Sequence, residues 1–101
     1  MANISAKGHS GQTYSFQLFP FETKFNPVSA VYMFLKDNAA LYIGKAKDLN
    51  NRMANHHKED QAKRLGANRI AILQVGTEAE RDRMERDLIA SHQPACNEQL
   101  K

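Results

Sequence analysis

Two tyrosines stand at a spacing that could place two phenol groups beside one substrate. Tyr32 and Tyr42 lie ten residues apart in two short apolar runs, which are separated by the polar residues 36–38. Runs of this length on either side of a turn predict a β-hairpin. With a three-residue loop, Tyr32 would pair directly with Tyr42, and directly paired residues on antiparallel strands point to the same side of the sheet. The spacing therefore predicts neighbouring phenols, although a one-residue shift in register would separate them.

A basic helix should follow this hairpin. Asp48 is a good N-cap residue, and Leu49, Arg52, Met53 and His56 follow at the spacing of one helical face. An arginine and a histidine four residues apart can hold a phosphate, because arginine offers a planar fork of donors and histidine a donor or a proton acceptor. The structural alternative is that the Arg52 stem packs at the rim and that His56 is an ordinary surface residue.

A single acidic residue is expected to face the sheet from the last helix. Thr77 and Glu80 form a capping-box signature, and the helical pattern extends to about His92. Glu85 is the only acid in the stripe that should face inward. A carboxylate in such a place costs free energy unless it is paired, hydrogen-bonded or bound to a metal. Glu85 could form a salt bridge to Arg81 or another basic residue, or it could bind a metal ion, and its position alone favours the salt bridge.

The remaining pattern predicts a small sheet that is covered by helices. Residues 1–12 lack apolar periodicity and are expected to form a disordered arm. Alternating apolar residues predict a strand over 13–19, and Pro20 marks it as an edge strand. A second short helix is expected over 58–65, and a central strand over 69–75, which is apolar on both faces. We expect an α+β domain with a mostly antiparallel sheet of three strands, plus the N-terminal edge strand.

Composition is typical of one ordinary globular domain, because 42% of the 101 residues are hydrophobic and 25% are charged. No apolar run is long enough to span a membrane. The single Cys96 can form no intrachain disulfide, which fits a reducing cytoplasm. The net charge of +3 is uneven, since residues 45–69 contain seven basic and three acidic residues. This segment is either a surface that binds a polyanion or a solvated, lysine-rich helix face.

In their order and spacing, these residues resemble the GIY-YIG nuclease family, and in particular the N-terminal catalytic domain of the nucleotide excision repair incision subunit. The resemblance covers about residues 28–98, which leaves 13–27 as an N-terminal strand and loop extension and 28–101 as the nuclease domain. Ala30 stands where the family often has glycine. The matching residues are Ala30-Val31-Tyr32, Tyr42-Ile43-Gly44, Lys45, Arg52, His56, Glu85 in Glu85-Arg86-Asp87-Leu88-Ile89, and Asn97 in Pro94-Ala95-Cys96-Asn97.

The resemblance implies a hydrolase, namely a divalent-metal-dependent endonuclease that cuts DNA phosphodiester bonds with low intrinsic sequence specificity. Glu85 would hold one Mg²⁺ or Mn²⁺ ion, because Mg²⁺ is commonly bound by one carboxylate, waters and phosphate oxygens. Arg52 would neutralise charge on the scissile phosphate. We favour Tyr32 as the general base and Tyr42 as the group that orients water or phosphate, but the sequence leaves this choice open.

The other site residues would assist this reaction. His56 would act by hydrogen bonding or proton relay, and Lys45 is a cation that could lower the pKa of a tyrosine. Gly44 and Asn97 would support the site structurally. The residues expected to contact DNA phosphates are Lys45, Lys47, Arg52, Lys58 and Lys63.

An alternative is a non-catalytic module of the same fold that binds a DNA structure or a partner protein. Silent family members should have lost the arginine or the glutamate, whereas Arg52 and Glu85 are both present here. DNA is the expected partner in the cytoplasm, with a protein partner or a homodimer supplying specificity and with no membrane association. The biological role stays open between repair, restriction, recombination and mobile elements.

Overall fold

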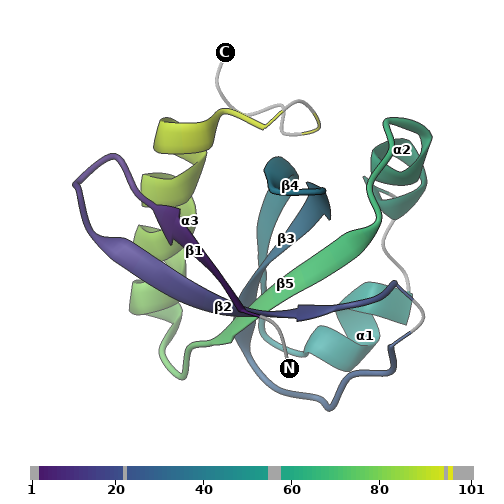
Figure 1. The fold of residues 1–101 in the computed structure, drawn as a ribbon. Coiled ribbons are helices and arrows are strands. Elements are labelled where there is room, and N and C mark those ends of the chain that lie inside the picture. The colour runs from purple at the N-terminus through teal and green to yellow at the C-terminus, as the bar shows by residue number, and fades with distance from the viewer. Residues whose placement is uncertain (1–2, 22, 55–57, 95, 97–101) are drawn as a thin grey trace.

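The computed structural model describes residues 3–21, 23–54, 58–94 and 96. These residues form a layered α+β domain in which α3 covers one face of a sheet and α1 and α2 lie against the other (Figure 1). No helix in these ranges is long and apolar enough to span a membrane. In chain order the elements are β1 (Asn3–Lys7), β2 (Thr13–Phe19), β3 (Ala30–Lys36), β4 (Ala39–Ala46), α1 (Leu49–Ala54), α2 (Lys58–Arg64), β5 (Arg69–Gln74) and α3 (Glu78–His92).

The sheet has five antiparallel strands in the order β1-β2-β5-β3-β4. The α+β class is therefore confirmed, but the expected number of three strands is wrong. β5 is the middle strand, as its two apolar faces predicted. β2 is not an edge strand, because β1 pairs with its outer side. Pro20 comes directly after the last residue of β2, so it interrupts no ladder hydrogen bond.

The expectation of a disordered arm over residues 1–12 is wrong for the residues that form β1. This strand is short, and only Ile4 and Ala6 point inward, so it has too few alternating positions to be read from the sequence. Its pairing with β2 supplies the missing stability, with Ala6 opposite Tyr14. Helix α3 holds the turn that follows β1, because the backbone N–H of His9 donates to the carbonyl of Asp87 at 3.0 Å.

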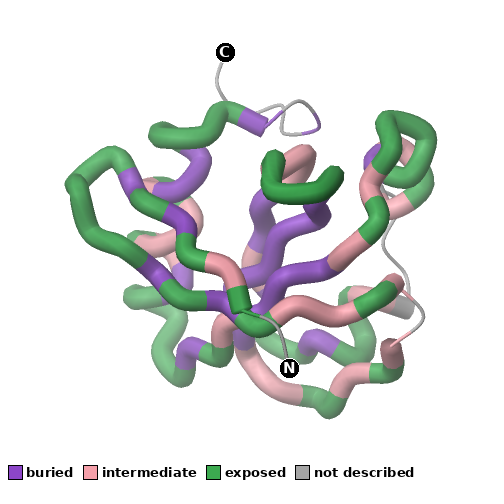
Figure 2. Tube along the Cα trace, viewed as in Figure 1, coloured by how far each residue is buried: buried purple, intermediate pink, exposed green. Residues whose placement is uncertain are grey.

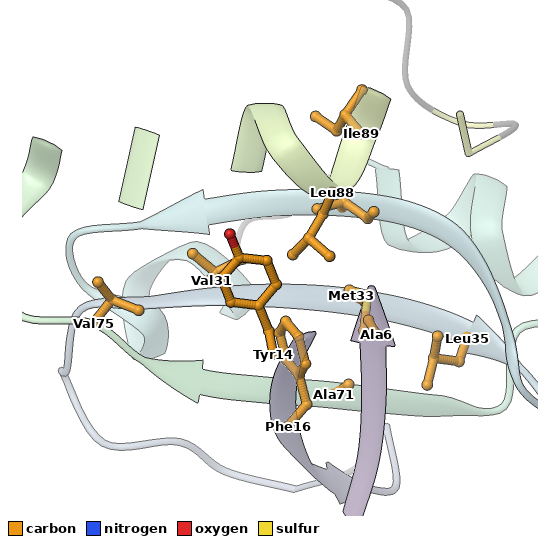
Figure 3. Close-up of a cluster of buried hydrophobic side chains, with 11 residues drawn as sticks. Ala6, Tyr14, Phe16, Val31, Met33, Leu35, Ala71, Val75, Leu88 and Ile89 are labelled. Atoms are coloured by element: carbon orange, nitrogen blue, oxygen red, sulfur yellow. The ribbon is translucent and has the colours of Figure 1, made fainter. Parts of the chain in front are cut away.

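Two apolar cores lie on opposite faces of the sheet. Figure 2 shows the buried positions concentrated in its central strands. The α3-side core includes Tyr14 and Phe16 of β2 beneath Leu88 and Ile89 of α3 (Figure 3). The core on the other face comprises Ala30, Tyr32, Phe34, Ala46, Leu49, Ala62, Ile70, Ile72 and Cys96.

The β3–β4 hairpin has a different register from the one expected. Its loop contains two residues rather than three, and the first of them, Asp37, adopts a left-handed φ of 55°. Asp tolerates this conformation, and the Arg69 guanidinium donates to the Asp37 carbonyl at 2.6 Å. A bulge in β4 then leaves Leu41 without a partner on β3.

As a result, Tyr32 pairs with Gly44, and Tyr42 pairs with Phe34. The predicted direct pairing of Tyr32 with Tyr42 is therefore wrong. The shorter loop and the bulge each shift the register by one residue, so together they shift it by two. Because side chains alternate with a period of two, both tyrosines still point to the same face.

Candidate active site

The two tyrosine rings lie side by side across the end of the sheet. Their centroids are 6.0 Å apart, with 35° between the ring planes. Gly44, opposite Tyr32, makes this arrangement possible. A Cβ atom at Gly44 would lie 2.6 Å from Tyr32 Oη and 2.8 Å from Tyr42 Cε2. The missing side chain at Gly44 thus leaves the space through which the Tyr32 phenol crosses the edge strand β4.

The two phenols occupy different surroundings. Tyr32 is fully buried, whereas Tyr42 is partly exposed. Burial raises the pKa of Tyr32 well above its ordinary value, and the neighbouring Tyr42 raises this pKa further, while the Arg52 charge lowers it. Tyr42 therefore has the better access to a water molecule.

Helix α1 brings Arg52 to the same face. The Asp48 carboxylate accepts a hydrogen bond from the backbone N–H of Asn51 at 3.0 Å, so Asp48 caps the helix as predicted. Leu49 is buried and anchors the first turn beneath the sheet. Arg52 is exposed beside a hollow of about 560 Å³ that is also lined by Pro27, Lys47, Asp48 and Asn51. A phosphate could reach the guanidinium from this side.

Helix α3 carries Glu85 from the other face of the sheet. The Thr77 hydroxyl accepts from the backbone N–H of Glu80 at 3.3 Å, which confirms the predicted N-cap. Buried Leu88 and Ile89 fix the helix on the sheet. The predicted alternative of an Arg81 salt bridge to Glu85 is wrong, because Arg81 is buried and donates to the Val75 carbonyl at 3.0 Å.

The charges around Glu85 connect it with the residues of the opposite face. Burial raises the pKa of its carboxyl group, while the charges of Lys45, Arg52 and Arg86 lower it. Glu85 also raises the pKa of Tyr32. Since the Arg52 charge lowers the pKa of both Tyr32 and Glu85, these three residues lie close enough for their charges to interact.

The donor set around Glu85 fits one hard cation with few protein ligands. Glu85 is partly buried and makes no ion pair within the described part of the chain. The same part contains no cluster of three or more His, Cys, Asp or Glu residues that could hold a metal. Structural zinc needs such a cluster, whereas Mg²⁺ keeps several waters and binds through one or two carboxylates plus substrate phosphate. The residues present therefore suit Mg²⁺ or Mn²⁺.

Lys45 makes a contact that the sequence did not predict. The residue follows Gly44 on β4, and its ammonium group forms an ion pair with Asp82 of α3. Asp82 stands one helical turn before Glu85, a spacing that places the two acids as neighbours on the helix surface. The spacing of Asp82 and Glu85 can be read from the sequence, but only the fold shows that Lys45 faces this turn of α3.

Only some of the remaining predicted site residues lie near Arg52. Lys47 is exposed beside Arg52, whereas Lys63 pairs with Glu59 at 3.0 Å and lies over the Phe21 ring at 5.0 Å. The backbone N–H of Cys96 donates to the Leu41 carbonyl at 2.8 Å, which ties the end of the described chain to the bulge in β4. The predicted roles of His56 and Asn97, and that of the Lys58 side chain, fall outside the described residues.

Comparison with known proteins gives consistent matches. The UvrC-like GIY-YIG domain model matches residues 28–98. UvrABC system protein C of Borrelia duttonii is 34% identical over 84 residues, which cover 77% of this chain and 14% of that protein. The same protein from Chlamydia pneumoniae is 37% identical over 90 residues, covering 80% of this chain and 15% of that protein. The chain thus spans about one seventh of the length of these curated relatives.

Solved structures agree with this assignment. The N-terminal GIY-YIG endonuclease domain of UvrC from Thermotoga maritima, bound to magnesium as its catalytic divalent cation, superposes with a TM-score of 0.63 at 28% identity. That match covers 72% of this chain and 86% of the other. A point mutant of the same domain, also bound to its catalytic divalent cation, gives a TM-score of 0.65 and covers 73% and 87%. The chain belongs to the family of UvrC-like GIY-YIG domains.

Proposed function

We propose that this protein is a divalent-metal-dependent endonuclease that hydrolyses DNA phosphodiester bonds with low intrinsic sequence specificity. The observation that carries the proposal is that the partly buried carboxyl of Glu85 and the tyrosine pair both interact with the Arg52 charge, although they come from opposite faces of the sheet. Glu85 is partly buried and has no salt bridge to any residue that the structure describes, and an acid in that position costs stability, which is typical of a site that works on a charged ligand.

Glu85, through the metal ion, and Arg52 would stabilise the negative charge of the phosphate. The Glu85 carboxylate would hold the ion, and Arg52, beside the open hollow, would neutralise negative charge on the scissile phosphate. When bound, the divalent ion supplies Lewis-acid stabilisation of the leaving oxygen. The exposed guanidinium can also bind two phosphate oxygens at once, which would orient the bond to be cut.

For the general base we favour Tyr42, in contrast to the preference for Tyr32 that the sequence suggested. Tyr32 is fully buried, and its raised pKa makes deprotonation costly. Tyr42 is partly exposed and could hydrogen-bond an attacking water. Tyr32 would then act by fixing the position of the Tyr42 ring, with Gly44 providing the space for both.

DNA binding by the isolated chain should be weak and dependent on salt. Of the predicted contacts, Lys45 and Lys63 already have acidic partners, while Lys47 and Arg52 are exposed beside one hollow. Neutralising about three phosphates gives a log–log salt slope of roughly −3, and non-specific binding of that kind is micromolar or weaker. Efficient cutting would therefore need a partner protein, a second copy or a distorted DNA.

The relatives suggest the setting in which such a partner would be found. They are protein C of the UvrABC system, and on this basis we place the proposed activity in DNA repair, with protein partners that bring the nuclease to its substrate. We also propose that the protein acts in the cytoplasm.

The test is incubation of the purified chain with supercoiled, single-stranded and branched DNA in Mg²⁺, in Mn²⁺ and in a chelator. We expect metal-dependent cleavage, and Arg52→Ala should lose most turnover. Arg64→Ala is a matched control, because Arg64 is an exposed arginine at the end of α2. It should weaken binding slightly and leave turnover intact. Binding without cleavage under every metal condition would support the non-catalytic module instead.

A further inference from the structure

Lys45 faces two carboxylates that stand one helical turn apart on α3. Its ammonium group is paired with Asp82, yet its charge also lowers the pKa of Glu85, so both acids lie within its electrostatic reach. The proposed mechanism uses Glu85 as the metal ligand and gives Asp82 no part.

Stability does not account for the Lys45–Asp82 pair. The side chains of Lys45 and Asp82 are 39% and 33% exposed. An ion pair with this much solvent access typically contributes about 0–1 kcal/mol. Burial disfavours the charged form of Glu85, which would therefore gain from a partner, yet in the described part of the chain it forms no ion pair. Because Lys45 pairs with Asp82, the partly buried carboxylate of Glu85 stays available for another ligand.

We propose that Asp82 is a positioning residue that holds the Lys45 ammonium away from Glu85 and thereby keeps the Glu85 carboxylate open to the divalent cation. Lysine has a long, flexible stem, so its charge settles wherever an acceptor holds it. Without Asp82, the ammonium group of Lys45 would be free to move toward Glu85, which its charge already influences, and would there compete with the metal for the same oxygens. This inference rests on the proposed function, because it assumes that Glu85 binds the ion.

The test is a double-mutant cycle read by Mn²⁺ binding to the full chain without DNA, followed by the electron paramagnetic resonance of free Mn²⁺. Glu85→Gln defines which part of the binding belongs to the site. Asp82→Asn should weaken this Glu85-dependent binding about tenfold, which corresponds to about 1.4 kcal/mol. In the Lys45→Met background, Asp82→Asn should have little effect, because no ammonium group remains to be moved. Asp82→Glu should restore most of the affinity.

The cycle separates this proposal from simple loss of a nearby negative charge. A direct effect of the Asp82 charge on the ion would weaken binding by the same factor with and without Lys45, and that result would overturn the proposal. So would unchanged Mn²⁺ affinity in Asp82→Asn. Glu78→Gln, which removes an exposed acid from the first turn of α3, is the matched control and should bind like the wild type. Absence of any Glu85-dependent binding would instead contradict the metal site of the proposed function.

Discussion

Replacing Gly44 by alanine should damage both the stability and the activity of the protein. The added methyl group would lie 2.6 Å from Tyr32 Oη, 2.7 Å from Tyr32 Cζ and 2.8 Å from Tyr42 Cε2. Carbon and oxygen atoms in contact normally stay more than 3 Å apart, so the rings must move. Tyr32 is fully buried, and its ring also packs against Phe34 with centroids 5.6 Å apart, so it has no free direction to move.

The size of the effect follows from this confinement. Overpacking a close-packed core costs about 1–3 kcal/mol, and rigid rings place Gly44→Ala in the upper part of that range. In a domain of about 100 residues, each kcal/mol lowers the melting temperature by about 4–8 °C. Gly44→Ala should therefore melt roughly 10–20 °C below the wild type. Because the clash displaces the two phenols, turnover should fall further than DNA binding.

Thermal denaturation followed by circular dichroism measures the stability, and single-turnover DNA cleavage measures the activity. Gly76→Ala is the matched control, since no atom lies within 4 Å of its added methyl group. It should stay within about 0.5 kcal/mol of the wild type. A Gly44→Ala protein that melts and cuts like the wild type would refute the proposed role of Gly44 in placing the tyrosines.

Three further predictions concern the two phenols and two of the acids of α3, Glu85 and Asp87. Tyr42→Phe should abolish single-turnover cleavage, while Tyr32→Phe should retain part of it because Tyr32 is buried; the reverse order would return the base role to Tyr32. Burial raises the pKa of Glu85, so the folded protein binds the carboxyl proton of Glu85 more tightly than the unfolded chain does. The stability of the fold therefore falls as the pH rises above about 4.3, the ordinary pKa of glutamate in an unfolded chain. Glu85→Gln should thus melt higher than the wild type at pH 8, and melting curves at pH 8 and 4 should show the difference shrink in acid; an equal difference at both would contradict the reasoning. Hydrogen bonds from Ser10 and Tyr14 lower the pKa of Asp87, so its stabilisation is present above about pH 3.9 and is lost as pH falls through the lowered value. Asp87→Asn should melt below the wild type at pH 7, and the gap should narrow near pH 2; a constant gap would mean that Asp87 acts without its charge.

Local signals in the sequence predicted most of the elements. The Asp48 cap, the capping box at Thr77 and the last residue of α3 are all found where they were expected, because each depends on contacts within one helical turn. The first strand was missed because its stability comes from pairing. The turn after it is held by hydrogen bonds from Ser10 to Asp87, 77 residues away, which no local pattern can show.

The sequence was sufficient to identify the family, but it did not give the geometry of the candidate site. The order and spacing of the tyrosines, Arg52 and Glu85 were sufficient to identify the family, which the comparisons confirm. The register of the hairpin depends on a bulge at Leu41 that has no sequence signature, and the burial of Tyr32 depends on packing from both sides. The contact of Asp82 could not be predicted for the same reason, since its partner Lys45 lies on another element, β4.

The central claim is that Glu85 binds a catalytic metal rather than serving the fold. The most direct measurement compares wild type and Glu85→Gln on one labelled DNA, recording cleavage in Mg²⁺ and equilibrium binding in a chelator. The account predicts that Glu85→Gln loses cleavage by at least about a thousandfold, an expected barrier increase of about 4 kcal/mol, while binding DNA as well as the wild type or better. Cleavage by Glu85→Gln at the wild-type rate would contradict the account.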